Sequence, residues 1–501
     1  MPDFASQQRE QKAYRNILKV TSIFGSEQLV QMLIALVRSK FLAIWLGPLG
    51  MGINSLLQTT LSLSEQIFSM GLHQSAVRDI AEAKNKDTDK QAKIIAVLIK
   101  WVWKSALVGG LFIVFFSFGF SLWIFDDSSY TLSFVLIGIA VFLKIVTTAR
   151  LAVLQGLQRY SSLAKVRILG SLVSLLIILP LYYVWREAAI APAILIATSV
   201  LFLVTLFFYR NIPKSSEKIS GNEFAKTGKN MMRLGFVMSL GGFLNMASLY
   251  AVQLFIQDSG SLSDVGLFSA GFTIIHVYFG MVFNAMTTDY YPRLAATDQS
   301  PNLLKKEVNR QAVFSLLITT PLILIILIFG KGLITLLYAA AFEQVYYFLF
   351  AALLGVPFKS ISFCFGFIFI AKGDVAVYGK TLIIFNLLFF AIMVTGYTLG
   401  DLQGLGIAFS LYYFIHLTVV VIISKLRYQL GFSGELLKII TISLLLVLAN
   451  MVLVYFDTIF FKYLKVLLLV VSLLFSLYYL NQKTHIFEML KKMIKRPEQD
   501  L

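Results

Sequence analysis

The sequence has few of the residues from which catalytic or metal-binding sites are usually built. With one cysteine and four histidines in 501 residues, it can form neither a disulfide within the chain nor a cysteine–histidine zinc site. Cys364 lies in an apolar segment, where we expect it to pack. The sequence contains no GxxxxGK[ST] loop that could bind ATP. We therefore expect no cofactor, no metal, no catalytic residue and no enzymatic activity.

Charged residues are also scarce. Only 14% of the residues are charged, against roughly 25% in an average soluble domain, whereas 58% are hydrophobic. The net charge of +17 does not indicate a nucleic-acid partner, because the cations are spread over short connections instead of one soluble domain. The first 19 residues carry several charges and lead into a helix that contains Glu27, so they do not resemble a removable signal peptide.

Long apolar runs fill most of the chain. They recur from residue 17 to residue 480, and each is long enough to cross roughly 30 Å of hydrocarbon. These runs predict an all-α membrane protein with about fourteen transmembrane helices. The predicted helices cover residues 17–44, 50–72, 97–124, 131–157, 163–185, 188–209, 230–256, 265–288, 309–329, 345–371, 376–398, 404–424, 436–456 and 463–480.

Lysine and arginine are distributed unequally between the two sides of the predicted membrane. The connections and tails of one side carry 33 of the 43 basic residues, and those of the other side carry four, namely Arg186, Lys331, Lys462 and Lys465. Basic residues collect in the loops that stay in the cytoplasm. The bias therefore supports the helix count and predicts that both termini are cytoplasmic. The outer connections are short and leave no room for a catalytic domain.

A weak internal repeat appears when Gly52 is set against Gly266, at an offset of about 214 residues. Each matched segment is an apolar helix followed by a long basic loop. Two six-helix units with the same orientation would place a substrate path between them. We therefore predict two parallel six-helix lobes around a central cavity, followed by two extra C-terminal helices and a basic cytoplasmic tail. The predicted boundaries are 1–210 for helices 1 to 6, 211–430 for helices 7 to 12, and 431–501 for the remainder.

Polar side chains follow single faces of several predicted helices, at spacings of three or four residues. A polar group in a bilayer costs free energy unless it faces protein or water, so such a stripe indicates either a cavity wall or a packing face. For His276, the alternative to a functional role is a hydrogen-bonded place in the core. The candidates for cavity lining or ion coupling are Glu27, Gln31, Asn54, Gln58, Glu65, His276 and Asn284.

Three cations within predicted helices are the candidates for substrate binding. Lys144 and Lys359 lie roughly 16 to 21 Å below the outer ends of their helices, beyond easy reach of the lipid headgroups. We expect both to face a water-filled cavity, with Arg38 as a third cation near the outer interface. The alternative for Lys144 is a structural ion pair with Glu27 or Glu65. The alternative for Arg38 is contact with lipid headgroups alone.

Two segments near the N-terminus carry a family resemblance. RSKFLAIWLGPLGMG at 38–52 and SMGLHQSAVRDIAEA at 69–83 resemble the Wzx-type O-antigen and polysaccharide flippases of the multidrug/oligosaccharidyl-lipid/polysaccharide (MOP) exporter superfamily. The similarity covers residues 17 to 95, and beyond them it is one of architecture. Within these segments the pair Arg78 and Asp79 is a family-like feature, for which we expect a structural role.

The resemblance implies a flippase that moves an undecaprenyl-pyrophosphate-linked O-antigen or polysaccharide repeat unit, as used in lipopolysaccharide, to the outer leaflet of the bacterial inner (plasma) membrane by alternating access. Its expected partners are this lipid-linked oligosaccharide, membrane lipids and other polysaccharide assembly proteins. A cationic lumen suits an anionic pyrophosphate and repels organic cations. Because Glu27 and Glu65 could bind a coupling ion, an ion-coupled multidrug (MATE-like) antiporter stays open. A lipid II flippase, which also moves an anionic lipid, is a further alternative.

Overall fold

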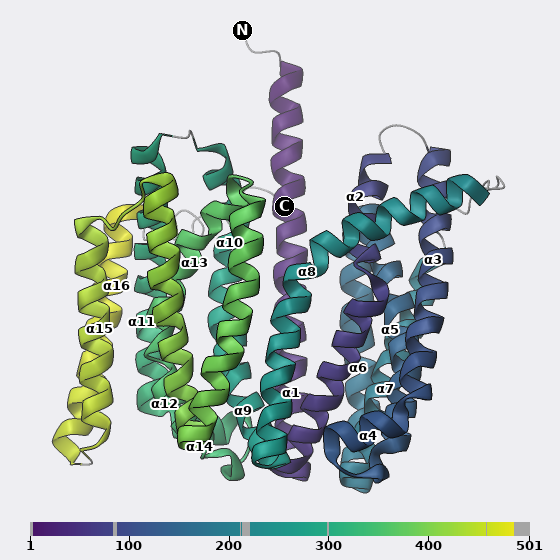
Figure 1. Ribbon diagram of the computed structural model, residues 1–501. Coiled ribbons are helices and arrows are strands. Elements are labelled where there is room, and N and C mark those ends of the chain that lie inside the picture. The colour runs from purple at the N-terminus through teal and green to yellow at the C-terminus, as the bar shows by residue number, and fades with distance from the viewer. Residues whose placement is uncertain are drawn as a thin grey trace, which may run out of the picture. The chain divides into compact units, whose positions relative to one another are not determined.

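The computed structural model describes residues 4–83, 88–210, 212, 221–297, 300–456 and 458–484. Every regular element among these residues is helical, which agrees with the predicted all-α class (Figure 1). Ten helical segments in this part of the chain are long and apolar enough to cross a membrane. There are eleven if α12 (Val345–Ala352) and α13 (Gly355–Ala371), which are bent by 52°, form one span. The protein is therefore a multi-pass membrane protein.

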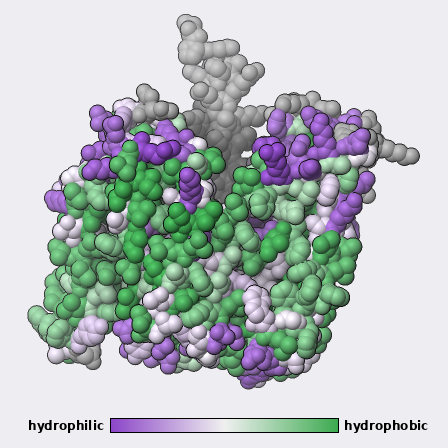
Figure 2. All heavy atoms as spheres, viewed as in Figure 1, coloured by the Kyte–Doolittle hydropathy of each residue, from purple (hydrophilic) through white to green (hydrophobic). Residues whose placement is uncertain are grey.

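The outer surface of the helices is apolar. On the face shown in Figure 2, hydrophobic residues cover the middle of the helices, and hydrophilic residues gather toward the helix ends. On α3 (Thr88–Phe115), Leu107, Leu111 and Phe115 are 54%, 58% and 82% exposed. Large apolar side chains exposed in such numbers indicate a surface that contacts lipid instead of water.

The chain forms two compact units. The first comprises Met1–Gly266 with Leu337–Ala339, and the second comprises Leu267–Leu336 with Ala340–Leu501. Within the first unit, α8 (Gly221–Ser259) packs against α1 (Phe4–Ser69) and α2 (Leu72–Ala83). The boundary at residues 210 and 211 was drawn from a sequence repeat and not from contacts, so it stays a prediction.

The first unit is a helical bundle in which α5 packs against α3 and α7. Short polar turns connect its helices. Asp126 ends α4 in a left-handed conformation, and the side chain of Asp127 then starts η1 by accepting a hydrogen bond from the backbone of Ser129. Besides those already given, its elements are α4 (Ser117–Phe125), η1 (Ser128–Tyr130), α5 (Thr131–Gly156), α6 (Tyr160–Trp185), η2 (Arg186–Ala189) and α7 (Ile190–Tyr209).

The second unit begins within α9 (Leu262–Ile274). Asp374 and Ser433 start two of its helices, because their side chains accept hydrogen bonds from the backbone of Val377 and Leu436. Its other elements, besides α12 and α13, are η3 (Ile275–Phe279, a π-helix), α10 (Gly280–Ala296), α11 (Pro301–Leu337), η4 (Ala340–Phe342), α14 (Val375–Tyr428), α15 (Gly434–Val454) and α16 (Ile459–Thr484).

Two long helices are broken where the sequence predicts outer connections. Gly47, with a φ of 66°, interrupts α1 next to Pro48, and residues 400 and 401 interrupt α14. A Cβ on Gly404 would lie 1.9 Å from the carbonyl oxygen of Gly396. The segments before and after the second break therefore pack backbone against backbone, a contact that only glycine allows at these positions.

Gly52 and Gly266, which the internal repeat matches to each other, lie in reciprocal backbone contact. A Cβ on Gly52 would lie 1.9 Å from the carbonyl oxygen of Leu262, and one on Gly266 would lie 2.0 Å from that of Pro48. The offset of about 214 residues also relates Pro48 to Leu262. The same contact is therefore made twice, once from each matched segment.

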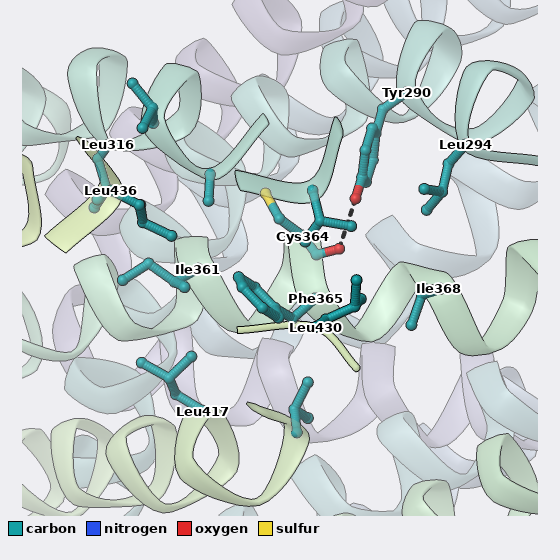
Figure 3. Packing of buried hydrophobic residues seen from close by; sticks show 14 of the residues in the cluster. Tyr290, Leu294, Leu316, Ile361, Cys364, Phe365, Ile368, Leu417, Leu430 and Leu436 are labelled. Carbon is teal, nitrogen blue, oxygen red and sulfur yellow. Dashed lines mark hydrogen bonds between the residues drawn. The ribbon is translucent and has the colours of Figure 1, made fainter. Parts of the chain in front are cut away.

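Tyr290 anchors the core of the second unit. It is fully buried, and its hydroxyl donates a 2.8 Å hydrogen bond to the carbonyl oxygen of Cys364 (Figure 3). Leu316 and Phe365 pack in the same cluster of buried residues. The cysteine is fully buried there, so its predicted packing role is confirmed. Without this hydrogen bond, burial of the tyrosine hydroxyl would cost free energy.

Replacing either contact glycine by alanine should destabilise the protein. We expect Gly52→Ala and Gly266→Ala each to cost about 1–3 kcal/mol, because the new Cβ collides with a backbone carbonyl that moves only if the helix shifts. Thermal unfolding of the detergent-solubilised protein measures the loss. Gly119→Ala on α4 is the control, since a Cβ there meets nothing within 4 Å. Equal stability of all three variants would contradict the reciprocal contact.

Candidate functional site

Lys144 lies on α5 in the first unit and contacts α1. Its Nζ donates a 2.8 Å hydrogen bond to Oγ of Ser62. Glu65, nearly one helical turn after Ser62, interacts electrostatically with Lys144 and is itself buried. The structure thus joins the polar stripes predicted on residues 50–72 and 131–157 through these three side chains. Both roles considered for Lys144, a cation facing a cavity and a structural partner of Glu65, therefore stay predictions.

Glu65 is also close to a second basic group. Its Oε1 lies 3.9 Å from Nδ1 of His73 on α2, and neither atom has a hydrogen-bond partner in the described chain. This distance is too long for a direct hydrogen bond but short enough for a charge interaction when the imidazole is protonated. The imidazole of His73 can therefore compensate the charge of the carboxylate only when it is protonated, and burial lowers the pKa of His73.

Two polar contacts join α1 to α6. Nη1 of Arg167 lies 3.7 Å from Oε2 of Glu27, and Oγ of Ser171 donates a 2.7 Å hydrogen bond to Oε1 of Gln31. Both helices advance by four residues between the contacts, so each pair lies on one face of its helix. The ion-pair partner of Glu27 is therefore Arg167 and not Lys144. The sequence analysis missed Arg167 because it counted the four basic residues of 150–167 with a cytoplasmic connection.

The remaining candidates of the first unit lie along α1. Arg38 is half-buried and interacts electrostatically with Tyr182 of α6. Asn54 and Gln58 are half-buried as well. The three residues therefore stay candidates for cavity lining, with the packing role of small and polar stripes as the alternative.

Two side-chain hydrogen bonds fasten α8 to the same part of α1. Nε2 of Gln253 donates to Oγ of Ser55 over 2.9 Å, and the hydroxyls of Thr60 and Tyr250 are 2.6 Å apart. Hydrogen bonds between side chains of different membrane helices remove polar groups from contact with lipid. Part of the polar surface of α1 thus serves helix packing.

Lys359 lies on α13 in the second unit and is surrounded by aromatic rings. Its Nζ lies 5.1 Å from the ring centre of Tyr413 and 5.8 Å from those of Phe283 and Phe409. Each such contact attracts the ammonium group to the negative face of the ring, by about 0.5–2 kcal/mol depending on desolvation. Lys359 forms no ion pair with any described residue. Aromatic faces therefore stabilise this cation without neutralising its charge.

Two histidines interact electrostatically with Lys359. His416 lies on α14, and its Nδ1 is 2.8 Å from Oγ of Ser362, one turn after Lys359. His276 lies in the π-helix η3, stacks on Phe272 with ring centres 5.9 Å apart, and has an exposed side chain. Asn284, the last candidate of this unit, is exposed on α10.

Sequence reasoning missed the aromatic and imidazole partners of Lys359. Phe409, Tyr413 and His416 follow one another at spacings of four and three residues, which places them on one face of α14. That spacing was visible in the sequence, but aromatic residues are common in membrane helices and nothing local tied these three to Lys359. Only the packing of α13 against α14 brings them together.

Arg150 is a further buried cation that the sequence analysis counted with a loop. It is 8% exposed, and its guanidinium carbon lies 5.1 Å from the ring centre of Phe202 and 5.5 Å from that of Tyr209. Both rings belong to α7, whose packing on α5 creates the contact. The aromatic compensation seen at Lys359 therefore occurs in the first unit as well.

The amino-acid sequence matches a known family over residues 17–298, more than half of the chain. The family is described as polysaccharide biosynthesis protein. The chain belongs to this family. The match includes both segments on which the resemblance was based and extends through α10, so the predicted membership is confirmed. No curated protein matches the sequence significantly.

Solved structures similar to this family member are transporters. The lipid II flippase MurJ in an inward closed conformation matches with a TM-score of 0.69 and 12% identity, over 93% of this chain and 99% of that one. An inward-facing multidrug resistance MATE family transporter of the MOP superfamily matches at 0.66 and 14% identity, over 80% and 94%. A MOP superfamily transporter from Pyrococcus furiosus matches at 0.55 and 13% identity, over 82% and 96%. At these identities the similarity establishes the fold, which is that of MOP superfamily transporters.

Both polar centres present a lysine ammonium group that can bind an anion. The described chain holds no group of three or more histidine, cysteine, aspartate or glutamate residues that could bind a metal ion. Lys144 and Lys359 are hydrogen-bond donors with no acceptor capacity, so each suits an anionic oxygen. Lys144 already interacts with a carboxylate, whereas Lys359 does not, and this difference separates their roles.

The electrostatic interaction between Lys144 and Glu65 makes a double-mutant prediction. Lys144→Gln should destabilise the protein by roughly 3 to 5 kcal/mol, because it leaves the buried carboxylate without its main counter-charge. Lys144→Gln combined with Glu65→Gln should recover most of that stability, and thermal unfolding of the three proteins measures the coupling. Lys104→Gln is the control, since Lys104 is an exposed cation on α3. Additive losses in the double variant would refute the pair.

Proposed function

We propose that this protein is a flippase that moves an undecaprenyl-pyrophosphate-linked O-antigen or polysaccharide repeat unit from the cytoplasmic to the periplasmic leaflet by alternating access. The observation that carries the proposal is the un-neutralised cation Lys359 inside a membrane helix. A lysine in hydrocarbon costs at least about 2.5 kcal/mol on insertion scales, and such residues mark substrate or ion pathways. Membership of the polysaccharide biosynthesis family supports the substrate class.

The lengths of the apolar segments support fourteen crossings. Three of the eleven candidate spans contain 45, 50 and 54 residues, about twice the roughly 20 needed for one crossing. Each has a turn inside it, at Gly47, at the η2 turn or at Gly400. Counting each of the three as two crossings adds three to eleven. The result is the number predicted from the sequence.

The glycine contact supports two parallel lobes. Gly52 and Gly266 make equivalent contacts from segments that the repeat matches, and an even number of helices per repeat gives both lobes the same orientation. Transporters built from two parallel repeats place the substrate near the axis that relates them. We assign Lys359, Lys144 and Arg38 to the substrate path of this proposal, with Arg38 near the outer interface.

The charges of the proposed path select for an anion. Lys359 is half-buried between aromatic rings and forms no ion pair with any described residue, so its ammonium group is available to a pyrophosphate. Lys144 shares its charge with Glu65, so we assign it to positioning and to a coupling group with His73. Glu27, Gln31, Asn54, Gln58, His276 and Asn284 complete the set of lining and coupling residues in this proposal.

One observation favours a second candidate function. Glu65 and His73 form a buried acid–base pair next to Lys144, and such pairs can bind and release protons. An ion-coupled MATE-like antiporter would use a group of this kind to drive export of organic cations. Lys359 argues against a cationic cargo, because like charges at close range repel. A lipid II flippase would share the anionic headgroup and differ in the sugar.

Orientation in the membrane can be tested by reporter fusions. We expect the protein to lie in the bacterial inner membrane with both termini in the cytoplasm, because the basic connections all lie on one side. A periplasm-dependent reporter should be silent after Leu501 and active at Asp127, Asp258 and Asp401. Activity at the C-terminus would contradict fourteen crossings.

The role of Lys359 can be tested by transport. Lys359→Gln should abolish delivery of polysaccharide to the cell surface and cause lipid-linked repeat units to accumulate, whereas Lys359→Arg should keep partial activity because the charge remains. Lys331→Gln is the matched control, because Lys331 also lies over an aromatic ring, at 5.8 Å from that of Tyr346, but is exposed. Protein abundance is measured in the same cells.

The same strains separate the alternatives. Altered efflux of cationic dyes with normal surface polysaccharide would favour the antiporter. Loss of viability with arrest of cell-wall synthesis would favour the lipid II flippase. Normal transport by Lys359→Gln would refute the anion-binding role of this residue.

A further inference from the structure

The second unit contains a large cavity apart from the residues assigned to the transport path. Its volume is about 1170 Å³, and it is lined by one face of α10, the N-terminal half of α11, the start of α15 and the end of α16. Lys359, His276 and His416 do not line it. Drug-sized ligands occupy pockets of roughly 300–1,000 Å³, so this cavity is large enough for a larger molecule.

Along one face of α11, the residues that line the cavity change from cationic to apolar. Adjacent pairs recur every four residues, beginning with the pair Lys305–Lys306 and ending with the pair Leu317–Ile318. Asn309 and Arg310 form the second pair, and Val313 and Phe314 form the third. At 1.5 Å per residue, this face is roughly 20 Å long. This change from cationic to apolar side chains is complementary to an amphiphile with an anionic headgroup and an apolar tail.

Three cations at the polar end are not neutralised by the protein. Arg293 is engaged with Asp289 at 3.4 Å and with Glu307 at 3.3 Å, and Lys483 is paired with Glu435 at 2.9 Å. By contrast, Lys305, Lys306 and Arg310 form no ion pair with any residue that the structure describes. The cavity therefore presents an excess of positive charge at one end only.

The start of α15 is fixed against this cationic face. The backbone N–H of Ser433 donates a 2.8 Å hydrogen bond to Oδ1 of Asn309, and Nδ2 of Asn309 donates to the carbonyl oxygen of Gly431 over 3.0 Å. Asn309 is buried, so the polar wall is built into the packing of α11 against the loop before α15. The N-terminus of α15, which is the positive end of its helix dipole, adds to the positive potential of Lys305, Lys306 and Arg310.

We propose that this cavity is a binding site for an anionic glycerophospholipid of the adjacent leaflet, which on the predicted topology is the cytoplasmic one. The phosphate binds Lys305, Lys306 and Arg310, and the upper part of the acyl chains lies along Phe314, Leu317 and Ile318. The outward faces of α15 and α16 carry exposed apolar residues such as Leu445 and Leu474, so bulk lipid surrounds this part of the unit. A phospholipid of the surrounding bilayer can therefore enter the cavity directly from the membrane. Unlike the transported lipid-linked sugar, it carries no sugar chain that would have to pass through the protein.

The occupant can be identified by fluorescence quenching. All five tryptophans lie between Trp45 and Trp185, so none is in the second unit, and Phe314→Trp adds a reporter to the apolar end of the cavity. The full-length protein is reconstituted in phosphatidylcholine vesicles that contain brominated phosphatidylglycerol or, at the same fraction, brominated phosphatidylcholine. The signal of the protein without the added tryptophan is subtracted. Stronger quenching by the anionic lipid is the expected result.

The cations are tested in the same background. Lys305→Gln, Lys306→Gln and Arg310→Gln together should weaken the preference for the anionic lipid on the order of 100-fold, since each basic residue near an anionic lipid contributes about fivefold. The matched control replaces Lys226, Lys229 and Arg233 of α8 by glutamine, which are also two lysines and one arginine, all exposed. Lys305→Arg, Lys306→Arg and Arg310→Lys together keep the charge and should keep the preference. Thermal unfolding shows whether each variant is folded.

Three outcomes would overturn the proposal. These are equal quenching by the two lipids, an equal loss of preference in the α8 control, and displacement of the brominated phosphatidylglycerol by a trace amount of undecaprenyl phosphate, which would identify an isoprenoid lipid as the occupant. Lys359→Gln in the Phe314→Trp protein should leave the preference unchanged. The lipid site and the transport proposal can therefore fail independently of each other.

Discussion

A charged side chain inside a membrane helix has no water to solvate it, and the cost of that desolvation determines how the interior of this protein is organised. Every such charge described above is met by a group from a neighbouring helix. Glu27 on α1 meets Arg167 on α6, and Lys144 on α5 meets Ser62 and Glu65 on α1. These contacts fix which faces of the helices turn toward each other. Apolar packing alone would specify this weakly, because lipid tails are as apolar as leucine.

The two units compensate their central lysines differently. At Lys144 the compensation is a hydrogen bond to Ser62 and an electrostatic interaction with the carboxylate of Glu65. At Lys359 it is three aromatic faces, which attract the ammonium group and leave the net charge in place. A lysine that interacts with a carboxylate is suited to holding helices together or to exchanging a proton, whereas a cation in an aromatic enclosure is suited to binding an anion. The difference gives the two lysines distinct roles, although in the sequence both are single cations in apolar helices.

Close approach of the backbone is the second constraint. At Gly52 and Gly266, and again at Gly396 and Gly404, the carbonyl oxygens of a neighbouring segment occupy the space that a Cβ would need. Such contacts place turns and helix ends to within a fraction of an ångström, because a backbone cannot yield as a side chain can. At Gly52 and Gly266 the contact is reciprocal, because each glycine lies against a carbonyl oxygen four residues before the other.

The sequence alone determined the features that depend on local composition. The apolar runs specify a helical membrane protein, the distribution of lysine and arginine predicts its orientation, and the segments at 38–52 and 69–83 indicate the family. It also located Lys144, Lys359 and Glu65, because a charge in an apolar run is conspicuous wherever it lies. The partners of those charges were decided by tertiary structure. Arg167 was one of several basic residues in its segment, and Phe283, Phe409 and Tyr413 were a few among many aromatic residues. Helix packing placed Arg167 beside Glu27 and the three rings around Lys359. The free-energy cost of burying a charge belongs to a single residue, so it can be recognised from the sequence. The group that offsets this cost is determined by distances between helices, which no local sequence pattern encodes.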